Sequence, residues 1–233
     1  MMGYERGLLP HAPTHKDYRV STSRIGREVG NDSDRPLSGA GESTERRFSW
    51  LLVITGAIGF FASAALVFER LQVFLDAGHK ASCDINALLN CGTVMRTPQA
   101  ELFGFPNPFI GIVAYAVILT LGTAMLAGAR FAKWYWICVN IGVVLGSIFT
   151  FWLWYQTTFQ IDALCLYCMI VWIVQTILSV SVTMHNIRVG IIPVSPRIAE
   201  TLPRWNWFLT VMILLVIFGI IFIRFFANIL AMF

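Results

Sequence analysis

Four of the five cysteines in this chain form two pairs whose positions suit thiol–disulfide exchange. Cys165 and Cys168 form a Cys-Leu-Tyr-Cys motif near the start of an apolar segment, and Cys83 and Cys91 lie in the longest polar loop between two such segments. A thiolate that attacks a disulfide forms a mixed disulfide and then a new disulfide, so neighbouring pairs can pass two electrons onward. The arrangement therefore favours electron relay at a membrane boundary over structural cross-linking.

The spacing of the second pair suits this chemistry. On a helix, a Cys-x-x-Cys pair places its sulfurs about one turn apart, within reach of a disulfide bond. We expect Cys165 two residues inside the fourth apolar segment, where the field of the helix N-terminus favours the thiolate. Cys168 then lies one turn deeper and faces the apolar interior, where a lipid-soluble oxidant can reach it.

The cysteines also allow interpretations without catalysis. Cys165 and Cys168 could form a permanent disulfide or be two buried thiols that only pack, since free cysteine often behaves as a small apolar residue. Cys83 and Cys91 alone could be a static disulfide that closes their loop. We expect no metal ion, although the sequence leaves open a site built from all four. Cys138, which has no second cysteine nearby, is expected to be a packing residue.

Composition indicates the environment that holds these pairs. Apolar residues make up 57% of the chain and charged residues 13%, against about 25% charged in soluble domains. The net charge of +4 is not a sign of nucleic-acid binding. Five apolar runs approach or exceed the roughly 20 residues that a membrane-spanning helix needs. They predict an all-α membrane protein with five transmembrane helices, at about 48–68, 108–129, 134–159, 163–184 and 205–223.

The remaining segments complete the predicted domain organisation. Residues 1–47 are polar and lack apolar periodicity, so we expect a disordered cytoplasmic tail. Residues 48–185 would form the four-helix catalytic domain and residues 186–204 a cytoplasmic loop. Residues 205–233 would form the fifth transmembrane helix and a short outer tail.

The distribution of positive charge predicts the orientation. Thirteen of the 17 Lys and Arg residues fall in the tail, in the turn after the second run, or in the loop before the fifth. Cytoplasmic segments carry such an excess. We therefore expect a multi-pass protein of the cell (cytoplasmic or inner) membrane, with a cytoplasmic N-terminus and an extracytoplasmic C-terminus. Both cysteine pairs then face the oxidising compartment.

The sequence resembles the vitamin K epoxide reductase family in these cysteines and in the segments around them. The likeness rests on the first cysteine pair, the Leu102-Phe103-Gly104-Phe105-Pro106 segment, Gly111 and the Cys165-Leu166-Tyr167-Cys168 motif, and it covers residues 48–185. The resemblance implies that the first four helices form a bundle around a quinone pocket.

The resemblance also implies roles by position. Cys83 would exchange with a thioredoxin-fold partner, Cys91 would carry electrons to Cys165, and Cys168 would lie beside the quinone ring. Three residues would contribute to quinone binding: Thr97, Asn107 and Trp172. Trp172 departs from the Tyr that some members carry there. Asn107 is equally suited to cap the helix that begins at Pro108.

The function implied is quinone-dependent thiol oxidation in support of disulfide bond formation. A membrane quinone, menaquinone or ubiquinone, would accept the electrons. Their donor would be a separate thioredoxin-fold, DsbA-like thiol oxidase on the extracytoplasmic face, because no thioredoxin-like domain follows the fifth run. These features favour the bacterial form of the family. Two alternatives are a vitamin K epoxide or quinone reductase, and a non-catalytic membrane scaffold with static disulfides.

Overall fold

The computed structural model describes residues 39–230 except 77, 79 and 87. Residues 44–230 belong to one compact unit, which contains both cysteine pairs. Residues 1–38 of the predicted tail lie outside the described residues.

Helices dominate the described part of the chain, and five of them are long and apolar enough to cross a membrane. This confirms the predicted all-α membrane protein. The five are α2 (Gly39–Leu75), α4 (Pro108–Leu126), α5 (Lys133–Gln156), α6 (Leu166–Arg188) and α8 (Asn206–Leu230). The shorter elements are α3 (Cys91–Met95), η1 (Pro98–Glu101), the π-turn η2 (Thr157–Ile161), α7 (Pro196–Thr201) and η3 (Leu202–Trp205).

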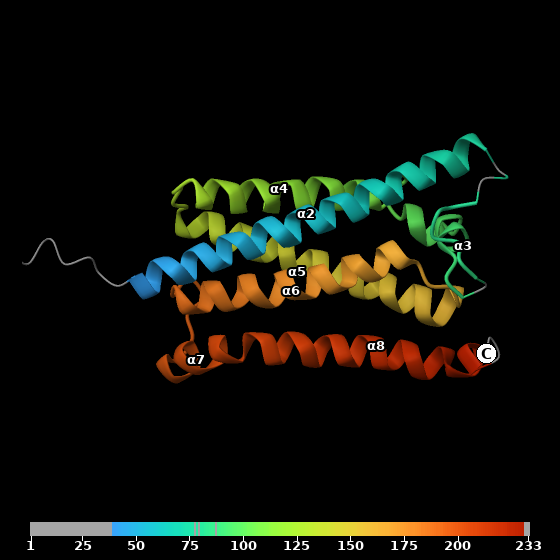
Figure 1. The fold of residues 1–233 in the computed structure, drawn as a ribbon. Coiled ribbons are helices and arrows are strands. Elements are labelled where there is room, and N and C mark those ends of the chain that lie inside the picture. The colour runs from blue at the N-terminus through green and yellow to red at the C-terminus, as the bar shows by residue number, and fades with distance from the viewer. Residues whose placement is uncertain (1–38, 77, 79, 87, 231–233) are drawn as a thin grey trace, which may run out of the picture. The chain divides into compact units, whose positions relative to one another are not determined.

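Successive long helices run in opposite directions, so the loop with the first cysteine pair and the start of α6 meet at one end (Figure 1). The first four long helices share a hydrophobic core, with Leu52 from α2, Leu121 from α4, Val143 from α5 and Leu178 from α6. Helix α8 packs against α6 through a separate cluster that includes Phe225 and Trp172. The four-helix core therefore positions the cysteines, and α8 lies against its outer side.

Helices α2 and α4 approach closely because small residues line their contact. A Cβ atom added at Gly56 would lie 2.7 Å from the backbone nitrogen of Leu119, and one at Gly122 would lie 2.8 Å from that of Val53. Small residues allow such approach in membranes, where helix association depends on van der Waals packing. The contact fixes α4, whose first turn borders the candidate site.

Gly56→Ala is therefore expected to destabilise the protein by about 1–3 kcal/mol, the usual cost of overpacking a well-packed interface. The measurement is thermal unfolding of the purified protein in detergent. Gly142→Ala is the matched control, because a Cβ there meets nothing within 4 Å. Equal stability of the two variants would contradict the close contact.

Two helix boundaries differ from those expected. Helix α2 begins at Gly39, inside the stretch assigned to the tail, and continues to Leu75, beyond the expected end at Phe68. The charged residues near the end of α2 do not end the helix, because they bind the loop that follows. The Glu69 carboxylate accepts from the Ser82 backbone N–H at 3.2 Å, and Arg70 donates to the Met95 carbonyl and to Glu101.

Candidate functional site

The loop between α2 and α4 contains a disulfide between Cys83 and Cys91, with Cα atoms 5.7 Å apart. The side chain of Asp84 supports this loop: its carboxylate accepts from the backbone N–H groups of Gly92 at 2.8 Å and Ala81 at 3.2 Å. Asn90 caps α3 by accepting from Thr93 N–H at 2.7 Å. The local sequence therefore builds a folded loop around the disulfide.

The segment before α6 pairs with this loop through backbone atoms. Leu164 N–H donates to the Leu88 carbonyl at 2.8 Å, and Asn90 N–H donates to the Leu164 carbonyl at 2.9 Å. The result is a parallel β-bridge between Leu89 and Leu164. Because Asn90 and Leu164 directly precede Cys91 and Cys165, the bridge brings these two cysteines together.

The bridge also corrects an expectation. Cys165 is not two residues inside a helix but at the N-cap position of α6, with extended backbone angles of φ −114° and ψ 122°. The hydrogen bonds to the loop hold residues 163–165 extended, so the helix begins only at Leu166. Cys168 is the third residue of α6 and so lies in the first turn of the helix.

Three sulfurs gather at this junction. Those of Cys83, Cys91 and Cys165 lie within 4.8 Å of one another, and all three residues are buried. A thiol at Cys165 is therefore next to the loop disulfide. The same cluster could bind a metal only after the disulfide is reduced, because a bonded sulfur pair offers no thiolates.

The electrostatics at Cys165 favour exchange. A hydrogen bond with the Cys168 thiol lowers the pKa of the Cys165 thiol; burial opposes this change, and the backbone groups of Tyr167 and Cys168 support it. A thiol with a lowered pKa is a good leaving group in disulfide exchange. The geometry and charge of Cys165 therefore suit a sulfur that both receives and releases a disulfide partner.

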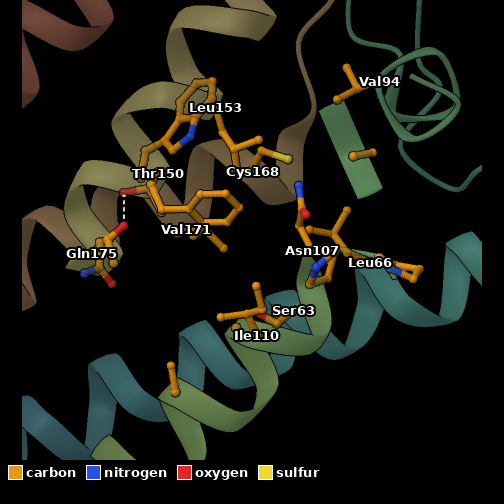
Figure 2. Close-up of a pocket in the computed structure, with 18 of the residues that line it drawn as sticks. Ser63, Leu66, Val94, Asn107, Ile110, Thr150, Leu153, Cys168, Val171 and Gln175 are labelled. Carbon is orange, nitrogen blue, oxygen red and sulfur yellow. Dashed lines mark hydrogen bonds between the residues drawn. The ribbon is translucent and has the colours of Figure 1, made fainter. Parts of the chain in front are cut away.

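Cys168 lines an apolar cavity of about 160 Å³ formed by residues of α2, α3, α4, α5 and α6 and the segment before α4. Figure 2 shows Asn107, Cys168 and Val171 around it. Trp172, which is 4% exposed, also lines the cavity. Two of the three residues implied in quinone binding thus meet Cys168 at one cavity.

Asn107 is held by its own chain. Its Nδ2 atom donates to the Gln99 carbonyl at 2.7 Å, and its Oδ1 atom accepts from Leu102 N–H at 3.1 Å. One N–H of the amide remains for a ligand in the cavity. The capping role weighed for Asn107 is wrong: it occupies the N-cap position of α4 but has helical backbone angles and makes no side-chain cap bond.

Thr97 lies next to the cavity rather than among the residues that line it. Its hydroxyl donates to the Val94 carbonyl at 2.7 Å, and its backbone precedes η1. Since Val94 does line the cavity, Thr97 can affect the shape of the site through this bond.

Comparison with protein families matches residues 50–183 to the vitamin K epoxide reductase family. This match covers more than half of the chain, including all four paired cysteines. The protein belongs to the vitamin K epoxide reductase family. Membership implies redox chemistry between disulfides and quinones in a membrane. Comparison with curated proteins found no match.

Several residues of this family member escaped the sequence analysis. Tyr115 of α4 donates its hydroxyl to the Gln175 side chain at 2.9 Å, and Gln175 donates to the Val143 carbonyl at 2.9 Å and to Ser147 at 3.2 Å. Tyr115 and Gln175 line the same cavity as Cys168. A lone glutamine in an apolar span was the available signal, since buried polar groups in membranes need partners.

Cys138 is not a packing residue. It is exposed on α5, so it faces away from the helices around the core. The expectation rested on its apolar neighbours in sequence, which do not distinguish a face directed at other helices from one directed at lipid.

Proposed function

We propose that this protein is a quinone-dependent thiol oxidase that takes electrons from a thioredoxin-fold protein outside the membrane. One observation carries the proposal: the loop disulfide, Cys165 and Cys168 form a continuous series of sulfurs that ends at the apolar cavity. Each neighbouring pair can exchange disulfides, and the last sulfur borders a site for an apolar acceptor.

The cycle balances in electrons. The partner's dithiol reduces the Cys83–Cys91 disulfide and leaves oxidised. Cys91 then attacks the Cys165 sulfur of a Cys165–Cys168 disulfide and releases the Cys168 thiol. Cys83 attacks Cys91 next, which re-forms the loop disulfide and releases Cys165. A loop disulfide with free thiols at Cys165 and Cys168, the state of the structure, corresponds to the end of this transfer.

The cavity suits a quinone. Its lining is mostly apolar, Trp172 offers an aromatic face, and Asn107 retains one N–H for a quinone oxygen. When bound, a quinone supplies the oxidising power by taking two electrons and two protons as Cys165 and Cys168 form their disulfide. The residues of this chain orient the acceptor and bring the Cys168 sulfur to the cavity.

Partner exchange requires the loop to move. Cys83 is only 3% exposed, so a partner's thiolate cannot reach its sulfur while the loop is closed. Ser82 and Tyr167 lie with their hydroxyl oxygens 3.2 Å apart and link the loop to the Cys-x-x-Cys turn. We infer that docking of the partner separates this contact and turns the Cys83 sulfur outward. The proposed orientation places this end of the bundle on the extracytoplasmic face.

Asn107→Asp tests the quinone contact. The aspartate keeps an acceptor for Leu102 N–H but loses both amide donations, including the one to the Gln99 carbonyl. We expect the KM for quinone to rise about tenfold, since a hydrogen bond contributes about 1–1.5 kcal/mol. Stopped-flow assay of quinone reduction measures this, and exchange between the partner and the loop disulfide should be unaffected. An unchanged unfolding temperature of the variant separates loss of the quinone contact from loss of the Gln99 bond. An unchanged KM would remove Asn107 from the binding site.

The proposed function is tested by anaerobic assay of the purified protein with a reduced thioredoxin-fold substrate and either menaquinone or ubiquinone. We expect quinol and oxidised substrate in equal amounts. The alternative function is reduction of vitamin K epoxide, which the same series of sulfurs supports. Turnover of epoxide with a small dithiol, without oxidation of a protein dithiol, would favour that alternative.

A further inference from the structure

A second cavity lies at the end of the bundle opposite the cysteines. It has a volume of about 600 Å³ and is formed by the start of α2, the end of α6 and the start of α8. Its lining is mostly apolar and includes Leu51, Ile177 and Met184. Two arginines, Arg47 and Arg188, also line it. A cavity with an apolar interior and cationic groups matches a ligand that is itself amphipathic.

Two buried polar atoms beside this cavity lack a hydrogen-bond partner among the described residues. His185, 5% exposed, stacks on Phe48 with ring centroids 4.1 Å apart, and its Nδ1 atom has no hydrogen-bond partner among the described residues. The same is true of the Asn206 Oδ1 atom. Both residues line the cavity. Buried polar atoms without a protein partner indicate a missing water, ion or ligand.

The surrounding charges favour an anion. Arg188 pairs with Glu45 at 3.2 Å, and Glu45 also lies 4.0 Å from His185 Nδ1. Arg47 is exposed at the cavity, and Arg204 adds a further exposed cation at this end. The charges of Glu45 and Glu200 offset only part of the positive charge of these arginines. The remaining positive charge is located where the apolar interior opens.

Two tryptophans show how the cavity relates to the bilayer. Trp50 and Trp207 both line it and are 48% and 62% exposed. Tryptophan is enriched at the level of lipid headgroups, where its amphipathic ring is best accommodated. The exposed apolar residues that follow on α2 and α8, such as Ile54 and Val211, continue the surface toward the bilayer centre.

We propose that this cavity binds a phospholipid with an anionic headgroup. The phosphate would lie between Arg47 and Arg188, and an acyl chain would occupy the apolar interior along α2 and α8. Basic pockets between membrane helices bind anionic headgroups in this way. A soluble anion would satisfy the arginines but leave the apolar interior without an occupant, so the lipid accounts for both parts. The proposal is independent of the reaction at the cysteines.

The charges around the site predict variants of opposite effect. Arg47→Gln should weaken binding of the lipid about fivefold, the effect of one cation near a lipid headgroup. Glu45→Gln should tighten binding, because it removes a negative charge and frees Arg188 for the phosphate. Arg46→Gln is the matched control: it removes the same charge from the neighbouring position, which does not line the cavity, and should leave the affinity unchanged.

The experiment is native mass spectrometry of the full purified chain in detergent, titrated with phosphatidylglycerol or with phosphatidylcholine of identical acyl chains. We expect phosphatidylglycerol to bind at least fivefold more tightly at one site, weaker binding by Arg47→Gln, tighter binding by Glu45→Gln, and no displacement by inorganic phosphate. Equal affinity for the two lipids, or equal weakening by Arg46→Gln and Arg47→Gln, would overturn the proposal. Displacement by inorganic phosphate would identify a free-anion site and would also overturn it.

Discussion

Cys168→Ala is expected to abolish quinone reduction while leaving the loop disulfide intact. Cys168 is the paired cysteine that lines the apolar cavity, so its loss removes the sulfur that faces the acceptor. Cys165 would retain its place beside Cys91 but could form no disulfide with a neighbour in the helix. The protein would still accept electrons at the loop and would have no route to pass them on.

The assay is quinol formation with a reduced protein substrate, followed by the absorbance change of the quinone. Cys138→Ala is the matched control, since Cys138 is exposed on α5 and takes no part in the exchange; its turnover should equal that of the unchanged protein. Persistent quinone reduction by the Cys168 variant would refute the assigned role and restore the interpretation of a static scaffold.

Cys91→Ala is expected to trap the partner. Without Cys91, the Cys83 thiolate can still attack the disulfide of the oxidised partner, which forms a mixed disulfide and releases the partner's second thiol. No neighbouring thiol of the loop is then present to resolve the adduct on the side of this protein. Partner-dependent quinone reduction should fall to background, because Cys91 is the loop sulfur that follows the bridge to Cys165.

Non-reducing electrophoresis measures the trapped species as a band at the summed mass of the two proteins, which a reductant removes. Cys83→Ala is the paired control and should form no such adduct through the loop. An adduct with the Cys83 variant but none with the Cys91 variant would reverse the order of the two loop cysteines in the relay.

The membrane helices could be predicted from the sequence because the bilayer imposes a simple requirement on length and polarity. The ends of these helices were harder to predict. Leu75 ends α2 one helical turn and more after the charged Glu69 and Arg70, which hydropathy alone treats as a stop. These two residues remain in the helix because the following loop supplies their hydrogen-bond partners. Predicting the end of α2 therefore requires knowledge of tertiary contacts.

The candidate site was predictable in its chemistry but not in its geometry. The four paired cysteines and Asn107 were found from residue type, spacing and resemblance. The extended backbone at Cys165 was not predicted, because it depends on two hydrogen bonds with a loop that is distant in sequence. Gln175 was missed for the same reason: its partners Tyr115, Val143 and Ser147 come from two other helices.

The bridge between Leu89 and Leu164 has a consequence for how the protein can diversify. Its two bonds join main-chain atoms, which all residues except proline can supply in full. Leu164 itself is buried, but Ile85 in the same loop is 63% exposed. A substitution at Ile85 can therefore change the outward surface without displacing Cys91 from Cys165. The outer face of this loop can thus be adapted to a new docking protein while the internal electron route is preserved. The length of the loop must be kept, and no proline may replace Asn90 or Leu164.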